Sequence, residues 1–200
     1  MSNLVVSAPE QKSIPIIEAG TYAAVCVSII DLGEHYNKTY DKNSRKVLFM
    51  WEIPDEQIEI DGEMKPRMIS ETYTASLGDK ANLRKTLESW RGRQFTAEEL
   101  ERFDLENVLG VPCMLSVIHT ENPNSGKTYA RVSAITRLPK GYPAIASTAE
   151  HVIFSLDDHD ALDKMQTLPE WVQNRIKESN TYNNMINTQF TDISAEDIPF

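Results

Sequence analysis

Cysteines and long apolar runs are scarce in this sequence, and their scarcity excludes several classes of protein. The two cysteines, Cys26 and Cys113, lie in apolar stretches without CxxC spacing, so we expect reduced core thiols and a cytoplasmic location. The longest apolar run, residues 22–30, is far short of the roughly 20 residues that a membrane-spanning helix needs. No basic segment followed by an apolar one opens the chain, so no secretory signal is predicted.

Catalytic and metal-binding signatures are also lacking. The sequence contains no GxxxxGK[ST], GxGxxG or GxSxG motif. Its four histidines show no metal-ligand spacing with one another, and no cysteine pair assists them. The acidic run at residues 157–160 is interpreted as a charged loop before a helix rather than as a metal site. We therefore expect no enzyme activity, no metal and no cofactor.

Positive charge is in deficit, because the formal net charge is −10. Such a deficit argues at first against nucleic acid as a partner. Its distribution is uneven: residues 1–142 hold 17 Lys and Arg against 20 Asp and Glu, whereas residues 143–200 hold 3 against 10. The first two-thirds of the chain can therefore still carry a local basic surface.

β-strand patterns dominate those first two-thirds. Stretches rich in β-branched and aromatic residues, bounded by turn formers, predict strands at residues 20–33, 46–53, 67–74, 112–120 and 128–138. Between the third and fourth strands, Leu83, Leu87 and Trp90 share one helical face, which predicts a helix over residues 79–90 with Asp79 as its N-cap. Residues 96–99 form a capping-box pattern that opens a shorter helix.

This order predicts a mainly β fold with a helical insertion, in the form of an OB-fold, a five-stranded Greek-key barrel. Other small mixed barrels would give a similar order. We expect an N-terminal arm (residues 1–16), the barrel (17–142) and a helical extension (143–179) with short helices at 160–165 and 169–178. Residues 180–200 are Asn- and Thr-rich without a period, which predicts a flexible linker and a disordered acidic tail.

The C-terminal tip combines negative charge, an apolar ring and the terminal carboxylate. A partner pocket with an arginine at its rim could bury the ring of Phe200 and pair its carboxylate. Pro199, next to Ile198, restricts the backbone and lowers the cost of ordering it. Glu196 and Asp197 would steer the tip toward a basic surface. The alternative is an accidental disordered terminus with an apolar end.

The tip at residues 196–200 resembles the C-terminal tip of bacterial single-stranded DNA-binding proteins, although its acidic run is shorter. Together with the strand order, it makes the chain similar to a phage or bacterial protein of that family. Residues 83–110, with Gly141, also look similar to small phage replication-module proteins described as DNA-binding. The resemblance implies an OB-fold, no catalysis, and recruitment of replication, recombination and repair proteins through the tip. It leaves open whether the chain is a homo-oligomer, and implies the host cytoplasm if the chain is phage-encoded.

Binding of unpaired DNA requires aromatic rings for base stacking and cations that follow the phosphates. Residues 34–46, between the first two predicted strands, supply both, and the corresponding loop of OB-folds is a usual ligand-contacting element. The candidates there are Tyr36, Lys38, Tyr40, Lys42, Arg45 and Lys46. The alternative is a solvated hairpin loop, in which such residues are common.

Further candidates lie on the strands and at the end of the inserted helix. Alternation puts Arg67 with Tyr73 on one face of the third strand, and Tyr129 with Arg131 on one face of the fifth. Trp51 is either a stacking platform or a core residue. The last candidates, Arg91 and Arg93 around Gly92, would form a phosphate clamp or complement the helix dipole beside a glycine cap.

The main hypothesis is therefore a non-catalytic single-stranded DNA-binding protein with single-stranded DNA and replication or repair proteins as partners, and without a membrane association. Two rivals remain. One is an adaptor or inhibitor that carries the tip into host proteins and binds no DNA. The other is an acidic DNA mimic that blocks a DNA-processing enzyme.

Overall fold

The computed structural model describes residues 14–38, 40–123 and 125–196. Five long strands form most of the body: β1 (Gly20–Asn37), β2 (Lys42–Ile60), β3 (Glu63–Thr74), β4 (Pro112–Glu121) and β5 (Thr128–Thr136). Between β3 and β4 lie α1 (Asn82–Arg91), α2 (Ala97–Glu101) and the 3₁₀-helix η1 (Leu105–Val108). After β5 follow β6 (Val152–Phe154), α3 (Ala161–Met165), α4 (Glu170–Lys177) and α5 (Asn180–Glu196).

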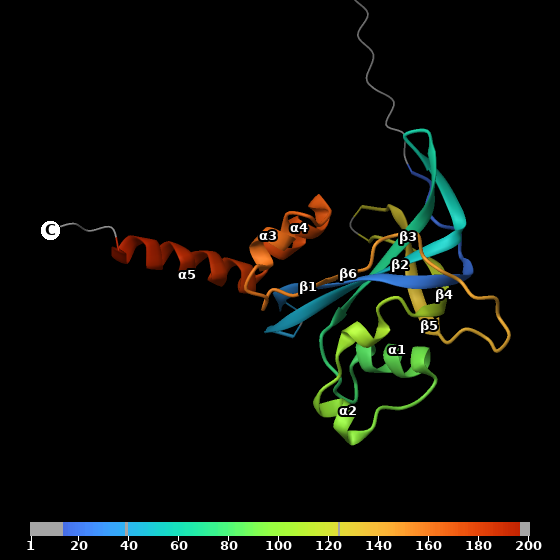
Figure 1. Ribbon diagram of the computed structural model, residues 1–200, viewed down its shortest axis with the longest axis horizontal. Coiled ribbons are helices and arrows are strands. Elements are labelled where there is room, and N and C mark those ends of the chain that lie inside the picture. Colours follow the sequence, from blue (N-terminus) through green and yellow to red (C-terminus); the bar gives the residue numbers. More distant parts are fainter. Residues whose placement is uncertain (1–13, 39, 124, 197–200) are drawn as a thin grey trace, which may run out of the picture.

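The long strands form a strongly curled antiparallel half-barrel in the order β3-β2-β1-β4-β5 (Figure 1). Register shifts in β1, between Cys26 and Ser28 and between Asp31 and Gly33, accompany the curl, because bulges bend a strand and increase its twist. The curl brings the outer strands β3 and β5 together, and Arg131 of β5 pairs with Glu71 of β3 at 3.2 Å. The mainly β fold with a helical insertion is thus confirmed, and its shape is compatible with an OB-like barrel.

The core of the half-barrel lies on its concave face. Trp51 is fully buried there, stacked on Phe49 with 5.7 Å between ring centroids. α1 covers this core with Leu83, Leu87 and Trp90, the predicted stripe. The interpretation of Trp51 as a stacking platform for DNA bases is therefore wrong, because its ring is not accessible, and the alternative core position is correct.

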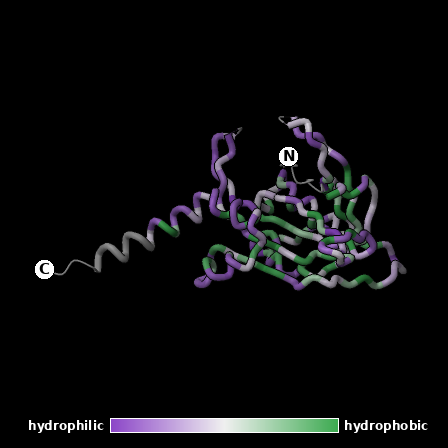
Figure 2. The backbone as a smooth tube through the Cα atoms, turned by 90° about the horizontal axis from the view of Figure 1, so that it is seen from above, coloured by the Kyte–Doolittle hydropathy of each residue, from purple (hydrophilic) through white to green (hydrophobic). Residues whose placement is uncertain are grey.

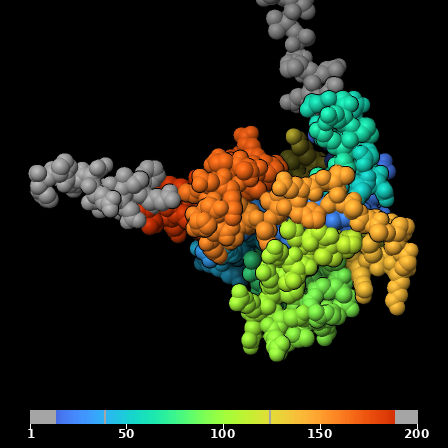
Figure 3. All heavy atoms as spheres, in the orientation of Figure 1, coloured from blue at the N-terminus to red at the C-terminus, as the bar shows by residue number. Residues whose placement is uncertain are grey.

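A second apolar cluster joins the C-terminal extension to the opposite face of β1 and β2. Ile30, Leu32 and Leu48 pack there against residues of β6, α3 and α4, including Val172 and Ile176. β6 pairs in parallel with residues 28–30 of β1, a strand that the sequence did not indicate. Figure 3 shows this extension, in orange, lying across the sheet. The extension and the half-barrel consequently share a core.

A buried carboxylate fastens the segment between β5 and β6 to the same face. Glu52 of β2 is 1% exposed and accepts hydrogen bonds from the backbone N–H groups of Thr148, at 2.7 Å, and Ala149, at 2.8 Å. The hydroxyl of Thr148 lies 3.2 Å from the second oxygen of the carboxylate. These bonds compensate for the loss of water around a charge that would be costly to bury alone.

Several predicted boundaries differ from the observed ones. β1 and β2 extend through residues 34–37 and 42–45, expected as loop, and leave a tight turn between them. Asp79 is not the N-cap of α1, which is Ala81, whereas the predicted capping box of Thr96 and Glu99 is confirmed. The expected linker after residue 180 is helix α5, which leads away from the body (Figures 1 and 2). Its first turn is held by a hydrogen bond from the Glu34 N–H to the Thr181 hydroxyl, at 2.9 Å.

Gly33 should be required for packing of the extension against β1. Its φ is +77°, and a Cβ there would lie 2.6 Å from Oγ of Ser179 and 2.9 Å from Cδ1 of Leu156. We expect Gly33→Ala to cost about 1–2 kcal/mol for the left-handed backbone plus about 1–3 kcal/mol for overpacking, measured by urea denaturation. Gly62→Ala is the matched control, because its φ is +82° with nothing within 4 Å. Equal losses for the two variants would contradict this close packing.

Candidate nucleic-acid interface

A groove of about 1330 Å³ lies over the seam where β3 and β5 approach each other. The β1–β2 hairpin borders it through Tyr40 and Lys42, and the segment that opens α1 borders it through residues 78–82, Lys85 and Thr86. Its Lys and Arg side chains come from five different elements or turns and are Lys42, Lys46, Lys80, Lys85, Arg131 and Arg175. Only Glu71 and Asp79 among its lining residues are acidic, so the groove has an excess of four positive charges.

Both acidic residues of the groove are engaged by arginines. Glu71 pairs with Arg131, and Asp79 pairs with Arg84 at 2.6 Å. The other five cations of the groove have no carboxylate within ion-pair distance among the described residues. They are Lys42, Lys46, Lys80, Lys85 and Arg175. Lys46 donates instead to the hydroxyl of Thr74 at 2.8 Å. The groove therefore presents cations whose charge is available to an anionic ligand.

The aromatic rings at the groove differ in what they expose. Tyr40 is 71% exposed and lines the groove from the hairpin turn. Tyr36 is 55% exposed on β1 and donates its hydroxyl proton to Asp41 at 2.5 Å, which orders the turn. Tyr73 is half-buried, packed edge-on against Phe49 at 5.7 Å. Tyr40 is thus the ring best placed to stack on an unpaired base.

The hydroxyl of Tyr73, in the groove wall, has a pKa shifted by burial. Burial raises the pKa of its hydroxyl to about 12, although a hydrogen bond with Thr86 of α1 opposes that rise. The hydroxyl therefore stays protonated at neutral pH.

Arg45 does not reach the groove, contrary to its predicted contact with phosphates. Its guanidinium binds Asp31 through Nε, at 3.0 Å, and Nη2, at 2.6 Å, and also binds Asp157 at 2.7 Å. Burial acts to raise the pKa of Asp31, but hydrogen bonds from Arg45, Gly33 and the backbone of Leu156 outweigh it and hold the pKa below its ordinary value. Arg45 therefore joins the hairpin to the extension.

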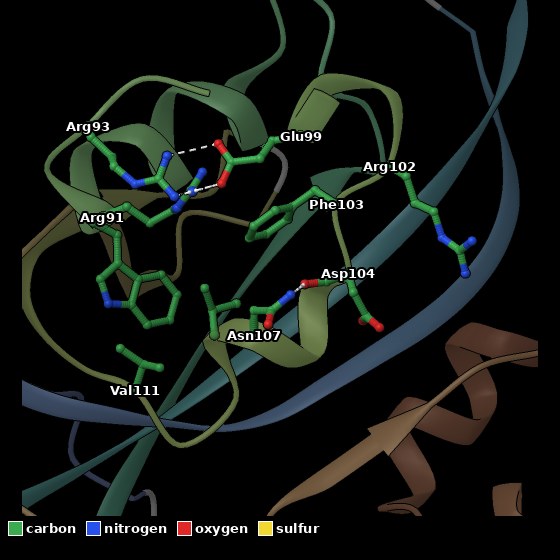
Figure 4. A pocket seen from close by; sticks show the side chains of 10 residues that line it. Arg91, Arg93, Glu99, Arg102, Phe103, Asp104, Asn107 and Val111 are labelled. Carbon is green, nitrogen blue, oxygen red and sulfur yellow. Dashed lines mark hydrogen bonds and ion pairs between the residues drawn. The ribbon is translucent and has the colours of Figure 1, made fainter. Parts of the chain in front are cut away.

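Arg91 and Arg93 line a separate cavity of about 490 Å³ in the insertion between β3 and β4 (Figure 4). Both pair with the carboxylate of Glu99, Arg93 through two bonds of 2.6 and 2.9 Å. The guanidinium of Arg91 also lies over the rings of Phe95 and Phe103, at 4.4 and 4.9 Å from their centroids. The partners of both arginines thus lie within the insertion between β3 and β4. This arrangement contradicts the predicted phosphate clamp.

The alternative interpretation of that segment, a capped helix end, is confirmed. Gly92 has a φ of +69° and donates its N–H to the carbonyl of Glu88, as a left-handed C-cap does. Arg91 lies in the last helical turn, where a cation complements the helix dipole.

The groove brings together five of the predicted residues, Tyr40, Lys42, Lys46, Tyr73 and Arg131. Lys38 is exposed in the hairpin turn, and Tyr129 is 43% exposed on β5 without lining the groove. Arg67 donates to the carbonyl oxygen of Pro15. Sequence reasoning missed Lys80, Lys85 and Arg175, for which the available signal was their place on polar helix faces and turns.

The predicted partner-binding tip falls at the limit of the description. Glu196 is the last residue of α5, and Asp197, Ile198, Pro199 and Phe200 lie outside the described residues.

Within residues 14–38, 40–123 and 125–196, no three His, Cys, Asp or Glu are grouped so that they could hold a metal ion. In the same ranges, every helix is too short or too polar to cross a membrane.

Comparisons with known proteins give no relative from which function could be transferred. No family model matches the chain, and neither the curated proteins nor the solved structures give a match. The function of the protein is therefore inferred from the chemistry of the groove.

The Glu99 cluster should make stability depend on pH in the acidic range. Hydrogen bonds from Arg93, the Thr96 N–H and Arg91 lower the pKa of Glu99 to about 2, from an ordinary value of about 4.3 in an unfolded chain. A lowered pKa in the folded state stabilises the fold above the unfolded pKa, and this contribution disappears as the pH falls toward 2. We expect Glu99→Gln to lower Tm at neutral pH, and the difference from wild type to shrink below pH of about 4.

Thermal denaturation at several pH values measures this difference. Glu101→Gln, an exposed position on the same helix, removes the same charge outside the cluster and serves as the control. A Tm difference for Glu99→Gln that stays constant between neutral and acidic pH would show that the ion pairs are not its source.

Proposed function

We propose that this protein binds single-stranded DNA, without catalysis, in the basic groove over the β3–β5 seam. One observation carries the proposal: a chain with a net charge of −10 gathers six Lys and Arg against two acidic residues in a single groove. Most of the acidic surplus lies elsewhere, so the groove can attract a polyanion in spite of the overall charge. Release of counterions from phosphates by these cations would supply the affinity.

An unpaired strand fits the groove better than a duplex. Tyr40 presents an exposed ring at the hairpin turn, and Lys42 lines the same groove. Stacking on an aromatic ring requires the face of an unpaired base, and it tolerates any base sequence. The combination of one accessible ring with several cations is therefore suited to binding a single strand without strong sequence preference.

The connectivity of the half-barrel supports the finer proposal that the domain is an OB-fold. A three-stranded β1–β2–β3 meander is followed by a helix, after which β4 pairs with the other edge of β1 and β5 with β4. Five strands in a partly open barrel with a helix after the third strand agree with an OB-fold, a fold that often binds oligonucleotides. The groove lies at the seam that closure of such a barrel would form.

Recruitment of replication, recombination and repair proteins through Glu196 to Phe200 is part of the same proposal. It rests on the resemblance of the tip to that of bacterial single-stranded DNA-binding proteins and on the chemistry of a terminal Phe. α5 supports it indirectly, because this helix, which immediately precedes residues 197–200 in the sequence, leads away from the half-barrel (Figure 1). A location in the cytoplasm, or in the host cytoplasm for a phage protein, belongs to this proposal.

Fluorescence anisotropy with labelled oligo-dT and with a duplex of equal length tests the function. We expect tighter binding of oligo-dT, with an affinity that falls as salt rises. The double substitution of Tyr36 and Tyr40 by Ala should weaken binding by about 1–3 kcal/mol for each stacked base lost. Tyr142→Ala, at an exposed position outside the groove, is the control and should bind as wild type does.

Two other results have distinct meanings in this experiment. Failure of the wild type to bind oligo-dT at low salt would favour the adaptor or the DNA mimic instead. Binding of oligo-dT by the double variant with unchanged affinity would leave the function in place but remove the hairpin tyrosines from the interface.

Deletion of Phe200 tests the recruitment proposal. We expect the shortened protein to keep its Tm and its affinity for oligo-dT while losing its protein partners, because small interfaces concentrate their energy in one or two anchors. Extension of the chain by one residue should cause a similar loss, because it displaces the carboxylate from Phe200. The measurement is affinity capture from bacterial lysate followed by identification of replication and repair proteins. Equal capture by wild type and both variants would contradict the proposal.

A further inference from the structure

The side of the groove formed by the segment that opens α1 has its own set of cations, separate from those of the β1–β2 hairpin. Lys80 lies in the turn before α1 and Lys85 lies on the helix, and both are exposed and line the groove. The nearest acidic residues in sequence are Asp79, beside Lys80, and Glu88, three positions after Lys85, and Arg84 binds both of them, at 2.6 and 3.1 Å. This side therefore faces the groove with two ammonium groups whose local charge is not cancelled.

The backbone that carries these lysines is firmly held. Leu83 and Leu87, on the opposite face of α1, are buried in the core of the half-barrel. Arg84 joins Asp79 to Glu88, with 2.6 Å to the Asp79 carboxylate and 3.1 Å from its Nε to the Glu88 carboxylate. Cations on a rigid element lose less conformational entropy on binding than cations on a mobile loop.

A third cation reaches the groove from the C-terminal extension. Arg175 is exposed on α4 and lines the groove, whereas its neighbours Val172 and Ile176 are fully buried against β1 and β2. The buried face of α4 thus fixes where Arg175 lies. The groove is consequently bordered by the hairpin, by α1 and by the extension, and each contributes at least one cation without a carboxylate partner.

On the basis of the proposed function, we infer that Lys80, Lys85 and Arg175 bind phosphates of the same single strand that the β1–β2 hairpin contacts. The strand then crosses the β3–β5 seam, with the hairpin and α4 near one side and α1 near the other. The inserted helix and the C-terminal extension are both parts of the DNA-binding surface. The β-strands supply the floor of the groove, and these two segments supply much of its charge.

A salt series with labelled oligo-dT separates this inference from the proposed function. Each phosphate contact to a single strand adds about 0.7 to the slope of log affinity against log salt. The double variant Lys80→Gln/Lys85→Gln should therefore lower the magnitude of the slope by about 1.4, and Arg175→Gln by about 0.7. Lys140→Gln/Lys177→Gln is the matched control, because it removes two exposed lysines outside the groove and leaves the net charge equal to that of the first double variant.

The outcomes are distinguishable. A reduced slope for Lys80→Gln/Lys85→Gln and for Arg175→Gln, with the control at the wild-type slope and all variants at the wild-type Tm, supports the inference. Identical slopes for the α1 double variant and its control overturn it, while binding by wild type keeps the proposed function. Absence of oligo-dT binding by the wild type itself overturns the proposed function, and the inference with it.

Discussion

The carboxylate of Asp31 is the junction on which the arrangement of the whole molecule depends. It accepts two hydrogen bonds from Arg45, one from the N–H of Gly33 at 2.9 Å and one from the N–H of Leu156 at 3.1 Å. One side chain therefore joins β1, β2 and the segment after β6. Removal of any of these donors would leave a largely buried charge with fewer partners, which is costly in a protein interior. The same junction ties the hairpin, which borders the groove, to the segment that leads into α3 and α4.

Local signals in the sequence predicted the elements that depend on nearby residues. Stretches rich in β-branched and aromatic residues located all five long strands. The Thr96–Glu99 pair located the start of α2, because a capping box needs only four consecutive residues. The Leu83, Leu87 and Trp90 stripe located α1 for the same reason. In the candidate site, this reasoning found the hairpin cations and Tyr40, which are neighbours in the chain.

The parts that sequence reasoning missed depend on contacts between distant residues. In the sequence, Arg45 is a cation close to Tyr40 with no evident partner. In the fold it binds Asp157, which lies 112 positions later in the chain. Alternation along β2 separates Leu48 from Phe49 and Trp51 but cannot tell which face is exposed, and here both faces are covered, one by α1 and the other by the extension. The groove itself is assembled from a hairpin, two strands, a helix start and α4, so no single window of sequence contains it.

The shared core of the half-barrel and the extension has a consequence for synthesis of the chain. Ile30, Leu32 and Leu48 leave the ribosome long before Val172 and Ile176, the residues that cover them. During that interval the nascent half-barrel presents an apolar face and an incompletely paired edge of β1, both of which favour aggregation. The apolar face is therefore covered, and the risk of aggregation removed, only when translation of the extension is complete, not when the strands form.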